Sequence, residues 1–95
     1  MTTTLSASPT ERVIWVDREG GMIVDPGVPD QVAIVIDRAH NESNVALAAR
    51  LARKVASSDH VYVCGTGAAR VEFEREFVAL THHPERLVDV APARG

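Results

Sequence analysis

The stretch whose residue types suggest chemistry runs from Val61 to Arg70 and reads VYVCGTGAAR. An apolar strand leads into a glycine turn and then into a helix, and the free N–H groups at a helix N-terminus bind phosphate well. The candidate anion or ligand site comprises Gly65, Thr66, Gly67, Ala68 and Arg70. Such a site would serve a small phosphate- or nucleotide-binding enzyme. The alternative is that the glycines only permit a tight turn.

This motif departs from the known nucleotide-binding loops. Arg70 stands where the dinucleotide fingerprint has its third glycine, the motif follows the fourth expected strand, and no Walker-type lysine is present. We therefore favour the structural turn and predict that the protein uses no cofactor.

Other reactive residues give weaker indications. Cys64 is expected to be a small core residue, and His82 and His83 are expected at the surface without further metal ligands. A two-metal nuclease would need a third carboxylate beside Asp17 and Glu42, at the end of the fourth strand, where Cys64 stands instead. We predict no catalytic residue and no metal site.

Composition narrows the class of protein. The 95 residues fit one domain, and with 4% aromatic residues the core must consist of small aliphatic side chains. The net charge of −3 argues against broad electrostatic binding to nucleic acid. A single cysteine excludes an intramolecular disulfide and favours a cytoplasmic setting, and no apolar run is long enough for a membrane span.

The chain is predicted to contain a disordered tail over 1–10, one domain over 11–92 and a short tail over 93–95. Hydrophobic patterns and turn residues predict the order β-β-β-α-β-α-β. This is the order of a ribonuclease H-like α/β fold with a mixed five-stranded sheet and helices packed on its apolar faces. The third strand is almost continuously apolar and is expected to be central. The expected strands are 12–17, 21–25, 31–37, 61–65 and 86–91, and the expected helices are 43–57 and 68–81.

Two features suggest contact surfaces. Arg50, Arg53 and Lys54 cluster near the end of the first helix, where they either favour the helix dipole or contact RNA or a partner. Trp15 lies on a strand whose two faces are both apolar, so either helices cover both faces or a partner covers one. We lean to a partner, which makes Trp15 a candidate interface residue, for example in a homodimer.

With these elements placed, the chain resembles the middle domain of the eukaryotic and archaeal peptide-chain release factor and of Pelota, and related bacterial proteins of the archaeal release-factor class. The resemblance covers residues 12–91. It is carried by VIWVDREGGMIVD, QVAIVID, NVALAARLARKVA, HVYVCGTGAARVEFEREF and RLVDVA.

This resemblance implies a role near ribosomes or tRNA. It does not imply peptidyl-tRNA hydrolysis, because the segment Asp37–Ser43, DRAHNES, lacks the Gly-Gly-Gln loop of that family. The first hypothesis is a non-catalytic module of translation-factor type that binds the ribosome, RNA or a protein partner. The alternatives are the phosphate- or nucleotide-binding enzyme and a homodimeric interaction domain.

Overall fold

The computed structural model describes residues 10–26, 33–65 and 67–89. The described elements follow the predicted order, with one added turn of 3-10 helix, η1, before the last strand. They are β1 (Glu11–Asp17), β2 (Gly20–Val24), β3 (Ile34–Asp37), α1 (Asn44–Val55), β4 (His60–Gly65), α2 (Gly67–Thr81), η1 (Pro84–Arg86) and β5 (Leu87–Asp89).

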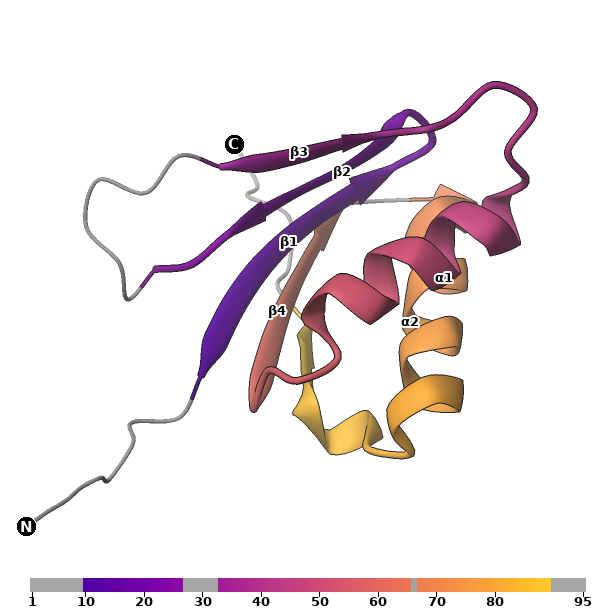
Figure 1. The fold of residues 1–95 in the computed structure, drawn as a ribbon. Coiled ribbons are helices and arrows are strands. Elements are labelled where there is room, and N and C mark those ends of the chain that lie inside the picture. The colour runs from indigo at the N-terminus through magenta and orange to yellow at the C-terminus, as the bar shows by residue number, and fades with distance from the viewer. Residues whose placement is uncertain (1–9, 27–32, 66, 90–95) are drawn as a thin grey trace, which may run out of the picture.

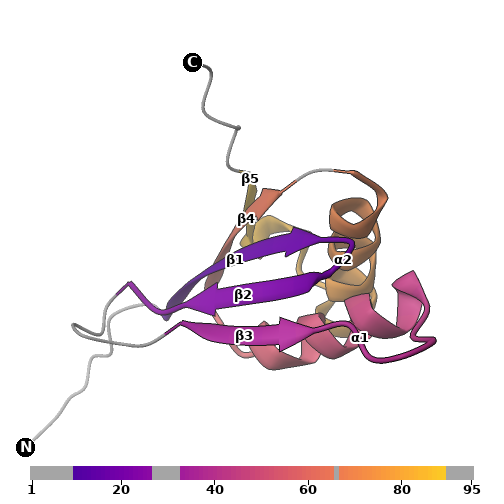
Figure 2. The same ribbon diagram turned by 90° about the horizontal axis from the view of Figure 1, so that it is seen from above.

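The strands form one mixed sheet in the order β3-β2-β1-β4-β5. β1 pairs antiparallel with β2, and β2 with β3, whereas the β1–β4 and β4–β5 pairs are parallel. Figures 1 and 2 show α1 and α2 side by side on one face of this sheet. The α/β class and the mixed sheet are thus confirmed. Of the two alternatives for the apolar faces, cover of both by helices is wrong for the described residues.

The core lies between the sheet and the helices. Ile14 and Val16 of β1 are buried there, and alternation along the strand turns Val13 and Trp15 to the opposite side. The buried apolar set is Ile14, Val16, Ile23, Ile36, Leu47, Ala48, Leu51, Ala52, Val55, Val61, Val63, Ala69, Phe73 and Phe77.

The third strand is at the edge of the sheet rather than at its centre, which corrects the prediction. β3 pairs with β2 alone among the described strands, and 64% of Val35 is exposed. The reason is topological. The two hairpin connections carry the chain outward from β1 to β3, and the free edge of β1 is then taken by β4.

Each α-helix begins within one residue of its predicted start. The hydroxyl of Ser43, the N-cap of α1, accepts a hydrogen bond from the N–H of Ala46 at 3.0 Å. In α2, Phe73 and Phe77 are fully buried, with ring centroids 6.1 Å apart. The i, i+4 stripe that they begin does not continue to Leu80, which is 48% exposed near the helix end.

Two glycines, one at the end of β4 and one at the start of α2, differ in what surrounds them, although both have a positive φ. Gly65 has φ 118°, and a Cβ there would collide with the carbonyl oxygen of Val16, its neighbour on β1. Gly67 has φ 81°, but a Cβ there would meet nothing within 4 Å. The close approach of strand β4 to β1 therefore requires glycine at 65 specifically.

This difference gives a matched pair of variants. Gly67→Ala should lower the free energy of unfolding by about 1–2 kcal/mol, the cost of a left-handed alanine. Gly65→Ala adds a steric collision and should cost about 3 kcal/mol or more. Urea unfolding of both variants measures the two losses, and equal losses would contradict the packing described at Gly65.

Candidate functional site

Of the predicted 65–70 site, Gly65 ends β4 and residues 67–70 form the start of α2, with Arg70 bent back towards Gly65. The Arg70 Nη1 donates to the carbonyl oxygen of Gly65 at 2.8 Å, and its Nε lies 3.4 Å from Glu74 Oε2. Arg70 and Glu74 thus form an i, i+4 ion pair on α2, as their spacing allows. Thr66, another predicted member of the site, lies outside the described residues.

A hollow of about 450 Å³ lies beside the start of α2. Gly67, Ala68 and Ala69 line it together with Asp17, Arg18 and Asn44, whereas Arg70 does not. An anion here would meet the carboxylate of Asp17 as well as the cation of Arg18. Arg70 therefore does not contribute its charge to this hollow, and the hollow has mixed charge from Asp17 and Arg18.

The basic residues of α1 are also divided. Arg50 is held by Glu42, to which it donates from Nε at 3.1 Å and from Nη2 at 2.7 Å, and it donates to the carbonyl of Asp37 at 2.7 Å. Arg53 and Lys54 are exposed in the last turn of the helix. Only the latter two are in a position to contact RNA or a partner with their charges.

Arg50 belongs to a network that fixes the loop between β3 and α1. Arg38 donates to the carbonyls of Arg18 and Glu42 and to the side chain of Asn44, at 2.6, 2.8 and 2.6 Å. Glu42 accepts from the N–H of Ala39 at 2.8 Å. The hydrogen bonds from Arg50 and Ala39 lower the pKa of Glu42. This loop, in which the sequence lacks the Gly-Gly-Gln motif, is tied to both β1–β2 and α1.

The sheet face turned away from the helices is called the open face below, and no described helix covers it. The exposed fractions of Trp15 and Met22 are 48% and 40%. Strand register aligns its side chains in two rows across the sheet. One row is Val35, Met22, Trp15 and Cys64, and the other is Val24, Val13, Tyr62 and Val88.

Cys64 lies in the first of these rows. It is half-buried beside Trp15, not in the core as expected, because Val61, Val63 and Gly65 take the buried positions of β4. In the second row, the Tyr62 hydroxyl donates to Oε2 of Glu11, the first residue of β1, at 3.3 Å. The negative charge of Glu11 raises the pKa of Tyr62.

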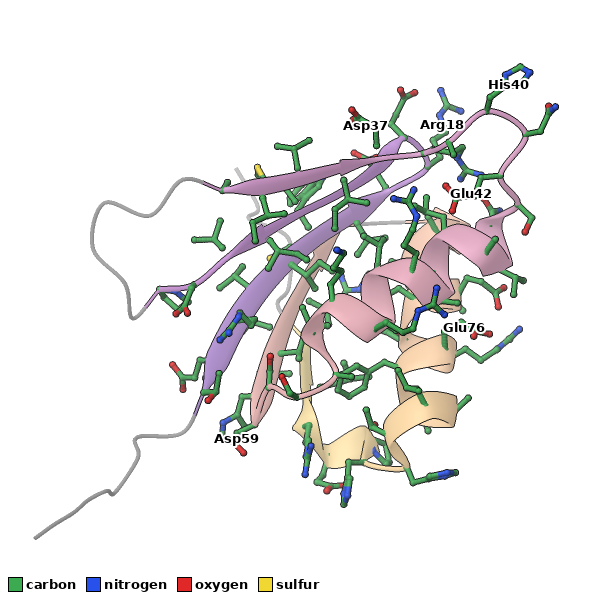
Figure 3. All side chains as sticks on the ribbon, viewed as in Figure 1. Arg18, Asp37, His40, Glu42, Asp59 and Glu76 are labelled. Atoms are coloured by element: carbon green, nitrogen blue, oxygen red, sulfur yellow. The ribbon has the colours of Figure 1, made fainter. Side chains whose placement is uncertain are left out.

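Carboxylates gather at the other end of the open face, around Gly20. Register places Gly20 between Asp17 and Asp37, and a hollow of about 230 Å³ lies beside these three residues. Trp15, Met22 and Val35 wall this acidic hollow, and Asp17, Glu19 and Asp37 give it negative charge. The indole Nε1 of Trp15 donates to Asp17 Oδ2 at 3.3 Å. Figure 3 shows Asp37 on the side away from the helices and Glu42 near α1.

That Asp17 and Asp37 lie close together was not predicted from the sequence, although the sequence contains a pattern that indicates it. Asp17 and Asp37 each end an apolar strand, in IWVD and IVID. Because β1 and β3 both run antiparallel to β2, they run parallel to each other and end at the same edge of the sheet. Two strands that end in Asp, with a glycine in the strand between them, predict such a hollow once the meander is recognised.

The remaining candidates behave as surface groups. His82 and His83 are exposed, and His83 Nδ1 lies 2.7 Å from Glu85 Oε2. Among the residues that the structure describes, no cluster of three or more His, Cys, Asp or Glu could hold a metal ion. No helix in the same residues is long and apolar enough to cross a membrane.

Comparison with known proteins found no relative. No protein-family model matches the chain, and neither the curated proteins nor the solved structures gave a match. The function must therefore be argued from the geometry.

The loop network makes a prediction about pH. Because Glu42 has a lowered pKa in the folded protein, its contribution to stability is full above about pH 4.5 and is lost as the pH falls through the folded-state value. Glu42→Gln should lower the melting temperature at pH 7, and the difference from wild type should narrow towards pH 3.

Thermal unfolding between pH 3 and pH 7 measures this effect. The matched control is Glu72→Gln, which removes an exposed α2 contact to Arg75 at 3.8 Å and should change the melting temperature far less. A constant difference between Glu42→Gln and wild type across the pH range would contradict the assignment.

Proposed function

We propose that this chain is a non-catalytic binding module that recognises a protein partner through its open face. The observation that carries the proposal is Trp15, a large aromatic side chain at the centre of an uncovered apolar sheet. Aromatic and methionine side chains are enriched in the buried centres of protein interfaces, and contiguous exposed apolar patches mark interaction sites. Trp15 and Met22 are adjacent on this face.

Charge favours a protein over RNA as the occupant of this face. Proteins that stack bases on an aromatic side chain surround it with positive charge that follows the phosphates. Trp15 instead donates to Asp17 and borders the acidic hollow. Arg53 and Lys54 are on α1, across the sheet, so RNA contact through them would leave the open face unused.

The nucleotide-binding alternative has weaker support. In this alternative, Arg70 would supply the positive charge that binds the phosphate. Its guanidinium already donates to the carbonyl of Gly65 and to the carboxylate of Glu74. The hollow at the start of α2 also contains Asp17. No observation favours this alternative over the open face.

The setting of the module is part of the proposal. The sheet order and the antiparallel β1–β2–β3 meander support a ribonuclease H-like fold. A role near the translational machinery rests on the sequence resemblance alone, and the cytoplasmic location rests on the single cysteine. In this setting the partner would be a protein of that machinery.

Photo-crosslinking tests the proposal. A photoreactive amino acid at Met22 should give a discrete adduct in cells of the source organism, since Met22 is beside Trp15 on the open face. The matched position is Val71 on α2, which is 53% exposed but on the helical side. It should give no such adduct.

The adduct formed at Met22 should also fall at least several-fold when Trp15 is replaced by Ser. Equal crosslinking from Met22 and Val71, or an adduct insensitive to Trp15→Ser, would contradict the proposed function.

A further inference from the structure

We infer that the occupant of the open face is a basic amphipathic helix of a partner protein, with Lys or Arg side chains near both of its ends and one of them in the acidic hollow. This inference rests on the proposed function and adds to it the chemistry of the partner. Three observations support it: the charges at the ends of the face, the shape of the hollow, and the size of the face.

The charges at both ends of the open face are negative. Glu11 begins β1 at one end, and Asp17 and Asp37 end β1 and β3 at the other. Of the arginines that pack against the end of the sheet, Arg38 donates to the carbonyls of Arg18 and Glu42. Arg50 donates to the carboxylate of Glu42 and to the backbone carbonyl of Asp37. An apolar surface with acidic ends is complementary to an apolar stripe with basic ends.

The same charges disfavour a second copy of this chain. In a face-to-face dimer, each end of the open face would meet an end of the partner's open face, and every end is acidic. Like charges brought together at an interface are repulsive, and that repulsion rejects wrong partners. The open face is therefore better suited to a basic partner than to the open face of a second copy of this chain.

The acidic hollow fits one long basic side chain. At about 230 Å³, it is smaller than the pockets of about 300–1,000 Å³ that hold small-molecule ligands. Trp15 and Met22 would cover the methylene stem of a Lys or Arg, while Asp17 and Asp37 would lie near its charged head. Cations are attracted to the face of an indole ring, which adds to this preference.

The size of the face suits a helix. Glu11 and Asp17 are six residues apart on β1, so the acidic ends are separated by about 20 Å at 3.3 Å per residue. A helix of about 14 residues covers that distance at 1.5 Å per residue.

The four intervals between five strands about 4.8 Å apart give the face a width of about 19 Å. That width accommodates one helix, whose diameter with side chains is about 10–12 Å.

Peptide binding to the full chain tests the inference. The probe is a designed 14-residue helical peptide with a leucine stripe at i, i+3, i+4, i+7 and two lysines in each terminal turn. The comparison peptide keeps the stripe and has glutamate at the four lysine positions. Trp15, the only tryptophan of the chain, reports binding through its fluorescence, which shifts to the blue when the indole leaves water.

The lysine peptide should shift Trp15 emission and bind at least about tenfold more tightly than the glutamate peptide at low salt. This advantage should shrink as the salt concentration rises, because exposed charges are screened. Bound peptide should also slow alkylation of Cys64, the only cysteine, which is adjacent to Trp15 in the register.

Charge reversal provides the matched control. The double variant Glu11→Lys, Asp37→Lys should prefer the glutamate peptide over the lysine peptide. Glu72→Lys, Glu76→Lys makes the same change of net charge on α2 and should keep the wild-type preference. Melting curves establish that both variants fold, and Asp37→Asn alone, which should weaken lysine-peptide binding, serves if the double reversal does not fold.

Each other outcome overturns the inference. Equal affinity for the two peptides, with Trp15 emission still shifted, rejects the basic partner and leaves the proposed function intact. No emission shift with either peptide up to millimolar concentration rejects the helix as occupant. Sedimentation of the free chain as a dimer with a buried Trp15 assigns the face to a second copy. Failure of the proposed function itself is seen separately, in the crosslinking from Met22.

Discussion

The direction of the two crossovers determines which surface of this protein is available. β3 runs parallel to β4, and β4 to β5, so α1 and α2 each connect parallel strands, and both connections progress in the same direction across the sheet. Such connections are right-handed in nearly all proteins, and two of the same hand and direction put their helices on the same face. The apolar core forms on that side, and the opposite face remains open (Figure 1).

The positions of β1 and β4 within the sheet explain why the open face is still apolar. β1 and β4 occupy the central positions of the sheet, where a strand carries β-branched residues on both faces. Ile14 and Val16 are buried in the core. Val13 and Trp15 lie on the open face, which no described helix covers. A sheet with this pattern is expected to be covered on its second face when it functions, and the acidic ends restrict what can cover it.

Much of this fold follows from local sequence signals. The glycine hairpin between β1 and β2, the Ser43 N-cap and the Arg70–Glu74 pair were all predictable from residue type and spacing. The position of β3 was not, because an apolar edge strand and an apolar central strand look alike in the sequence. Cys64 was misassigned for a related reason. Alternation on β4 gives its face only once the partner strands are known.

The candidate site shows the same limit. Arg50 was a candidate for contact with RNA or a partner, and Arg70 was a candidate for anion binding. In the fold, Arg50 is bonded to Glu42 and Arg70 to the carbonyl of Gly65. The acidic hollow depends on Asp17 and Asp37, which are 20 positions apart and are brought together by the meander. Charges that interact through tertiary register cannot be assigned from spacing alone. Trp15, in contrast, was identified as an interface candidate from the sequence. Its strand is apolar on both faces, so packed side chains or a partner must bury each face.

The central claim is that Trp15 lies in water on an uncovered face of the free protein. Acrylamide quenching of its fluorescence tests this most directly, since the chain has no other tryptophan. We predict efficient quenching and an emission maximum typical of a hydrated indole, with no change on dilution. A blue-shifted Trp15 that resists acrylamide at every protein concentration would contradict the open face and the account built on it.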